Sequence, residues 1–105
     1  MPFSLQALTV AVTLVIPTAE TVPTLNVEPG CRAAARVGDS LDASLQTCMS
    51  DENTAHNDLQ KQWTQFPVAD RERCTALSEQ VKASYVALLQ CLITSREAKK
   101  IERAQ

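Results

Sequence analysis

The sequence predicts an all-α fold: a small, disulfide-stapled bundle of two helical hairpins, containing three or four helices. After Gly38 the chain has no further glycine and one proline, Pro67, while Ala, Leu, Gln, Glu, Lys and Arg dominate. Apolar residues recur there at intervals of three or four, which is typical of a helix with one buried face. Four cysteines form two pairs, and sixteen residues separate the members of each pair.

Residues 1–19 are predicted to be a signal peptide. The stretch from Leu5 to Ile16 is almost wholly apolar, and no charged side chain occurs before Glu20. An apolar run of about twelve residues is too short to span a bilayer, but it suits the central region of an export signal. The basic residues usual at the start of such signals are missing here. A retained anchor at a membrane surface is therefore the alternative.

Residues 20–29 carry two prolines and several β-branched residues, so they are predicted to form an extended, mobile arm. Residues 30–105 form the predicted helical domain. Its first helix is expected over residues 30–37, with Gly38 as the stop signal, because glycine is favoured just after a helix.

A long second helix is expected from Leu41 to Phe66, with Asp39 or Ser40 as its N-cap. Pro67 ends it, since a residue that precedes proline is disfavoured in the α conformation. Glu52 is the one polar residue on the buried stripe of this helix. The apolar positions of the stripe are Leu41, Leu45, Cys48, Ala55, Leu59, Trp63 and Phe66.

Two further helices are expected, over residues 68–78 and 83–104, with a break at residues 79–82. That segment carries no glycine or proline, so a helix that continues through it is the alternative. The long helix begins in an acidic region, and the last helix ends in a basic region. Each charge cluster suits the dipole of its own helix. A more specific interpretation is that the long and last helices pack antiparallel. This packing would bring the acidic start of the long helix beside the basic end of the last helix.

The cysteines predict two disulfides, because an even number in a short chain is typical of an oxidising compartment. The favoured pairing is Cys31–Cys48 and Cys74–Cys91, in which each bond closes a local hairpin. Antiparallel packing of the long and last helices would keep Cys48 and Cys91 about 10 Å apart along the axes. The nested pairing, Cys31–Cys91 with Cys48–Cys74, is the main rival, and four reduced thiols remain an alternative.

Several chemistries are not expected. No two cysteines are spaced as zinc ligands usually are, and there is no C-x-x-C redox motif. His56 is the only histidine, without a nucleophile motif around it, and two glycines offer no phosphate-binding loop. A net charge of −2 gives no nucleic-acid footprint. We therefore predict no catalytic residue, metal or cofactor, and no membrane span in the mature chain.

The aromatic residues Trp63, Phe66 and Tyr85 allow two interpretations. Antiparallel packing would gather them into one cluster, where they would form the core near the hairpin turn. Alternatively, they form an exposed patch that contacts a protein partner, because large exposed apolar patches usually mark interaction sites.

Residues 29–100 carry a more specific pattern. Its distinctive pieces are the Cys31/Cys48 spacing, the segment 59–66 around Trp63, and the segment 84–92. The pattern resembles a group of small exported proteins of soil-dwelling alphaproteobacteria, a group with no assigned activity. The resemblance implies export and the cysteine framework, and it implies no mechanism.

We therefore expect an exported, periplasmic or secreted, helical protein that is not an enzyme and that has a binding or structural role. One alternative is a stress-linked holdase chaperone that exposes apolar helix faces when it is loosened. Another is an enzyme or inhibitor that acts through an unrecognised site.

Overall fold

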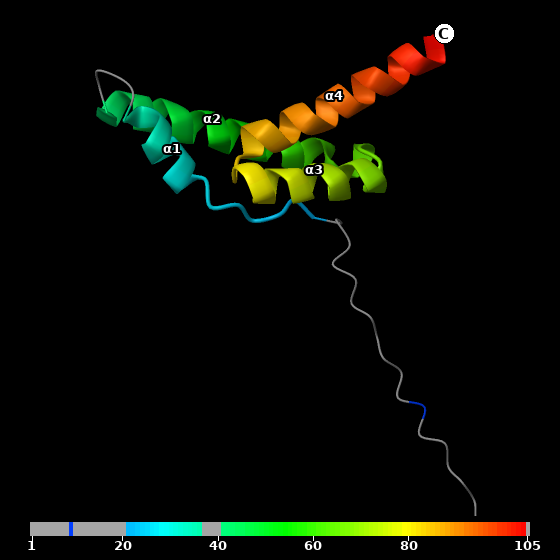
Figure 1. Cartoon of the computed structure of the whole chain (residues 1–105), viewed down its shortest axis with the longest axis horizontal. Helices are drawn as coiled ribbons and strands as arrows, with labels where there is room; N and C mark the ends of the chain where they lie inside the picture. The colour runs from blue at the N-terminus through cyan, green and yellow to red at the C-terminus, as the bar shows by residue number, and fades with distance from the viewer. Residues whose placement is uncertain (1–8, 10–20, 37–40, 105) are drawn as a thin grey trace, which may run out of the picture.

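The computed structural model describes Thr9, residues 21–36 and residues 41–104. These residues form helices and no strand, and the predicted all-α, two-hairpin bundle is confirmed (Figure 1). The first hairpin consists of α1 and α2, and the second of α3 and α4, with a short 3₁₀ turn, η1, between them. The bounds are α1 Glu28–Ala35, α2 Leu41–Gln62, η1 Trp63–Gln65, α3 Val68–Val81 and α4 Tyr85–Ala104.

Each hairpin is closed by its own disulfide, as the favoured pairing predicted. Cys31 of α1 is bonded to Cys48 of α2, with their Cα atoms 5.5 Å apart. Cys74 of α3 is bonded to Cys91 of α4, with a Cα separation of 5.7 Å. Neither bond crosses from one hairpin to the other.

The largest differences from the predicted helix boundaries are at the ends of α3 and α2. Helix α3 continues to Val81, and the chain leaves the helical conformation at Lys82 (φ −162°, ψ 122°). Residues 79–81 contain neither glycine nor proline, so nothing in them stops a helix. Helix α2 ends at Gln62, four residues before the expected end at Phe66, and the 3₁₀ turn η1 follows it. Phe66 itself is extended (φ −83°, ψ 141°), as expected for a residue before proline. The predicted stop at Gly38 and the N-caps at Asp39 or Ser40 lie outside the described residues.

The predicted antiparallel packing of the long and last helices is wrong, because α2 and α4 run in the same general direction (Figure 1). Tyr85 at the start of α4 stacks on His56 in the middle of α2, and Arg96 further along α4 lies over Phe66. Residues 68–81 form a full 14-residue helix that returns along the bundle, so the next helix points the original way. The basic end of α4 therefore meets Asp70 at the start of α3 and not the acidic start of α2.

The correct pairing was thus predicted partly for a wrong reason. Residues of α4 that contact α2 have numbers about 30 higher than their partners in α2, as Tyr85 and His56 show. Cys91 is then level with about residue 61. That position is some 13 residues, or about 20 Å, along the axis from Cys48. A bond between Cys48 and Cys91 is excluded by the observed direction as well.

The arm before α1 has no helix or strand over residues 22–27, but it packs against the bundle, in contrast to the mobile arm expected. Leu25 is buried in the core. The Tyr85 hydroxyl accepts a hydrogen bond from the Leu25 backbone N–H (2.8 Å) and donates one to the Pro23 carbonyl (3.1 Å). One buried ring therefore fastens the arm to the start of α4.

The three aromatic residues lie in the core, and the alternative of an exposed aromatic patch is wrong. Trp63, Phe66 and Tyr85 are 3%, 1% and 5% exposed. Burial of such large rings is among the strongest apolar contributions to a small core. The arm, α2, η1, α3 and α4 all contribute to it: Leu25, Ala55, Leu59, Trp63, Phe66, Cys74, Tyr85, Leu88 and Leu92.

Among the described residues, no helix is long and apolar enough to cross a membrane.

We expect the two disulfides to contribute unequally to stability. Both close loops of the same length, which the loop-entropy model rates at about 3 kcal/mol each. Cys74 also belongs to the central core, and Cys91 packs against it, whereas the other pair lies outside that cluster. The Cys74→Ala/Cys91→Ala variant should therefore lose more free energy of unfolding than Cys31→Ala/Cys48→Ala, as measured by urea denaturation. An equal or larger loss for the first-hairpin pair would contradict this ranking.

Candidate functional site

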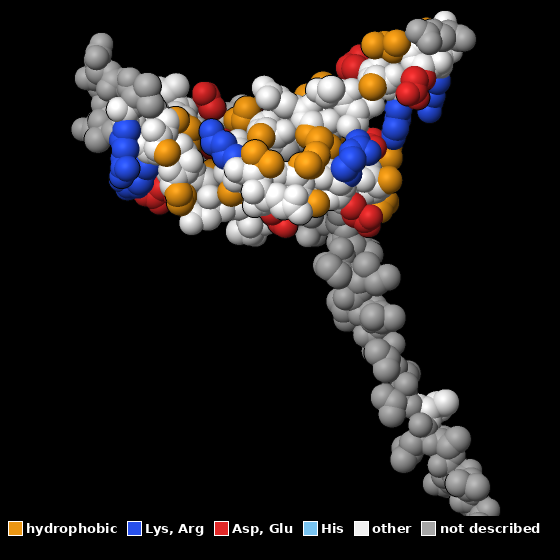
Figure 2. Space-filling model, in the orientation of Figure 1, with side chains coloured by type: hydrophobic (Ala, Val, Ile, Leu, Met, Phe, Trp, Pro, Cys, Tyr) orange, Lys and Arg blue, Asp and Glu red, His pale blue; other side chains and the backbone are white. Residues whose placement is uncertain are grey.

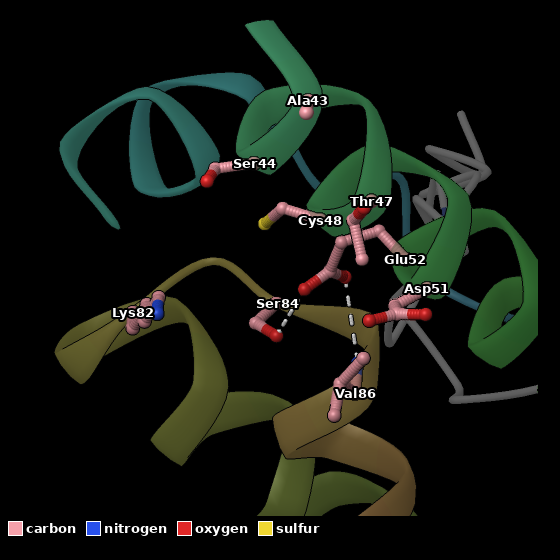
Figure 3. A pocket seen from close by; sticks show the side chains of 9 residues that line it. All are labelled: Ala43, Ser44, Thr47, Cys48, Asp51, Glu52, Lys82, Ser84 and Val86. Carbon is pink, nitrogen blue, oxygen red and sulfur yellow. Dashed lines mark hydrogen bonds between the residues drawn. The ribbon is translucent and has the colours of Figure 1, made fainter. Parts of the chain in front are cut away.

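A hollow of about 530 Å³ lies where the first hairpin meets the start of α4 (Figure 3). Helix α2 forms one wall, and the connection between α3 and α4 forms the other. Most of the lining side chains are polar, and they carry both signs of charge. They are Ala43, Ser44, Thr47, Cys48, Asp51, Glu52, Lys82, Ser84 and Val86.

Glu52 is the central residue of this junction. It projects from α2 and is only 5% exposed. One carboxylate oxygen accepts a hydrogen bond from the Ser84 hydroxyl (2.6 Å), and the other accepts from the backbone N–H groups of Tyr85 (2.6 Å) and Val86 (3.4 Å). Figure 3 shows the carboxylate reaching from α2 towards the first turn of α4.

Ser84 completes the cap on α4. Its hydroxyl oxygen accepts from the Ala87 backbone N–H (3.2 Å), and its carbonyl accepts from Leu88 N–H (3.0 Å). The first N–H groups of a helix have no partner within the helix, so they need acceptors from elsewhere. A serine N-cap and a carboxylate together form a capping box, in which the carboxylate normally comes from the same helix. Here the carboxylate comes from the other hairpin.

The junction also holds two charged side chains that solvent can reach, Asp51 and Lys82. The stem of Lys82 passes close to α1, where a Cβ on Gly30 would stand 3.2 Å from the Lys82 Cε. Asp51 and Lys82 give the rim of the hollow one negative and one positive group. Such a rim suits contact with a polar molecule.

The arrangement does not resemble a nucleophilic site. The Ser84 hydroxyl is 2.6 Å from a carboxylate, but its oxygen is occupied by the Ala87 N–H as a helix cap. His56, the one candidate base, does not line the hollow and stacks on the Tyr85 ring with centroids 4.1 Å apart. Within the described ranges, no three potential metal ligands gather in one place.

A second buried carboxylate, Asp70, holds the far end of the α3–α4 hairpin. It accepts from Lys99 Nζ at 2.8 Å and from Arg73 Nη2 at 3.1 Å, and its side chain is 2% exposed. The hydrogen bond from Lys99 is the largest cause that lowers the pKa of Asp70, opposed by the cost of burial, with Arg73 adding to the lowering. Asp70 is therefore held in its charged form.

No protein-family model, no curated protein and no solved structure matches this chain.

Sequence reasoning noticed Glu52 as a polar residue on an apolar stripe but did not assign it a role. The signal was available, because a buried carboxylate requires hydrogen-bond donors, and helix N-termini supply them. Identifying α4 as the donor required the direction of α4, which was predicted wrongly. The predicted site residues Trp63, Phe66 and Tyr85 lie in the core and do not line the hollow.

We expect Glu52→Gln to destabilise the fold by about 1–3 kcal/mol, because an amide offers one acceptor oxygen where two are used and removes the charge favoured at a helix start. Asp51→Asn is the matched control, since it removes the same charge from an exposed neighbour. Urea denaturation should show a clear loss for the Glu52 variant and a change within about 0.5 kcal/mol for the control. Similar losses in both variants would remove the special role of Glu52.

We expect the stabilising effect of Asp70 to depend on pH. Because its pKa is lower in the folded state, its contribution is complete above the ordinary aspartate pKa, about 3.9, and is lost as the pH falls through the folded-state pKa. Asp70→Asn should thus be less stable than the unmodified chain at neutral pH, and the gap should narrow in acid. Thermal unfolding between pH 2 and pH 7 measures it. A gap that stays constant over this range would contradict the assignment.

Proposed function

We propose that the chain is an exported protein, periplasmic or secreted, that is not an enzyme and that binds a protein partner. Export is supported by the two disulfides, which persist in oxidising compartments, and by the apolar run within residues 1–19. The resemblance to small exported proteins of alphaproteobacteria points the same way.

A binding role is supported above all by the outer surface of the second hairpin. Leu77 and Val81 of α3 are 48% and 83% exposed, although both are large and apolar. They line one groove together with Ala87 of α4 and the Cys74–Cys91 disulfide. Hydrophobic side chains gather over this part of the molecule in Figure 2. We call this surface, defined by Leu77, Val81 and Ala87, the α3–α4 face.

The absence of catalysis is part of the proposal, and the use of the buried acids supports it. Glu52 and Asp70 are the buried carboxylates of the described residues. Glu52 caps α4, and Asp70 pairs with Lys99 and Arg73, so each already has a structural use. A general acid or base would need a group that is free to exchange its proton with a substrate.

The test is a pull-down from the native envelope and secreted fractions with three forms of the oxidised protein. The unmodified chain and Ile101→Gln, which alters an exposed apolar residue outside the α3–α4 face, should retain the same partner. Leu77→Gln/Val81→Gln should lose it while keeping its helical circular dichroism. Retention of the partner by the double variant would overturn the proposed binding surface.

A further inference from the structure

We infer that the α3–α4 face docks an amphipathic helix of a partner protein whose apolar stripe has a carboxylate at each end. The inference rests on the proposed binding function and specifies the chemistry of the partner.

The face is a shallow groove of about 290 Å³ whose walls are almost wholly apolar. The Cys74–Cys91 disulfide lies in the groove between the two helices. Leu77 and Val81 form one side, and Ala87 lies on the other. A groove between two helices that exposes apolar side chains suits an amphipathic helix, which presents anchors at intervals of three or four residues.

Positive charge lies at both ends of this groove. Lys82 lines the end where α3 passes into α4. Beyond the disulfide, the Arg73 guanidinium bridges the hairpin by donating to the Ser95 hydroxyl (2.6 Å), and 53% of its side chain stays exposed. Arg73 and Lys99 share the single carboxylate of Asp70, so these three groups together carry one net positive charge.

The charge arrangement selects one kind of occupant. Figure 2 shows Lys and Arg side chains on either side of the central hydrophobic area. Arg73 lies on α3, and Lys82 follows the end of α3 nine residues further along the chain, so their backbones are separated by about 14 Å along the helix axis. A helix returns to the same face after eleven residues, so it can place two carboxylates on one face about 16 Å apart, with its apolar residues between them. A fatty acid has one carboxylate and would satisfy only one end.

The experiment uses the oxidised full chain and two fluorescein-labelled helical peptides of 18 residues. Both peptides carry the same Leu/Ala stripe; one has Glu at positions 4 and 15, which lie on the same face as the stripe, and the other has Lys there. Fluorescence anisotropy measures Kd for each. The Glu peptide should bind about tenfold more tightly or better, and the difference should shrink in high salt, because exposed charges are screened.

Charge reversal of the groove provides the decisive comparison. Lys82→Glu should weaken the Glu peptide about tenfold and should improve binding of a peptide with Lys at one end only. That gain of binding keeps the test valid even if Lys82→Glu costs some stability. Lys61→Glu is the control: it makes the same charge change at an exposed position on α2, outside the groove. This variant should bind the Glu peptide and the Lys peptide with the same Kd values as the unmodified chain.

Three results would overturn the inference. The first is equal binding of the Glu and Lys peptides. The second is binding of dodecanoate that depends on Lys82 while neither peptide binds, which would identify an anionic amphiphile as the occupant. The third is sedimentation as a dimer that Leu77→Gln/Val81→Gln dissociates, which would identify a second copy of the chain. The double variant Leu77→Gln/Val81→Gln could lose the native partner while the Glu and Lys peptides bind equally. That result would support the proposed binding function and reject only the requirement for a carboxylate at each end of the partner helix.

Discussion

The carboxylate of Glu52 on the first turn of α4 is the contact that joins the two halves of this protein. Each disulfide closes one hairpin and neither links the hairpins to each other. The hairpins are connected covalently only by the turn through η1 and Pro67, so non-covalent contacts must set their relative position. Among those contacts, Glu52 is directional, because its two oxygens meet the Ser84 hydroxyl and the Tyr85 N–H at 2.6 Å each. Apolar packing alone has no such directional requirement.

The same turn of α4 also organises the arm and the middle of α2. Tyr85 follows the capping serine directly, and its ring stacks on His56 while its hydroxyl binds two backbone groups of the arm. Fixing the start of α4 therefore fixes the arm as well. The position of the start of α4 also determines how α4 packs against α3. The apolar groove on the outer side of the second hairpin lies between these two helices.

Composition and local spacing were sufficient to predict the helices and the two hairpins, and they favoured the observed disulfide pairing, although one argument for that pairing assumed the wrong direction of α4. Those features depend on short-range information: the absence of glycine, the stop at Pro67 and the equal cysteine spacing. The direction of α4 was missed because the antiparallel interpretation treated residues 67–82 as a connection, whereas α3 is a full helix between two reversals, one at Pro67 and one at Lys82. The role of Glu52 was missed for that reason. The burial of Trp63, Phe66 and Tyr85 was one of the two interpretations that the sequence allowed, and the other, an exposed interaction patch, is wrong. The α3–α4 face was missed because Leu77 and Val81 look like ordinary core residues in a sequence.

Amide hydrogen exchange at Tyr85 and Val86 in the oxidised protein tests the central role of Glu52 most directly. The first N–H groups of a helix have no partner within the helix, and without an external acceptor they exchange quickly. If the Glu52 carboxylate holds the start of α4, the Tyr85 N–H should be protected like the amides of the buried core, and Val86 to a lesser degree. Exchange of the Tyr85 N–H at the rate of an unprotected amide, while the core of α4 stays protected, would contradict it.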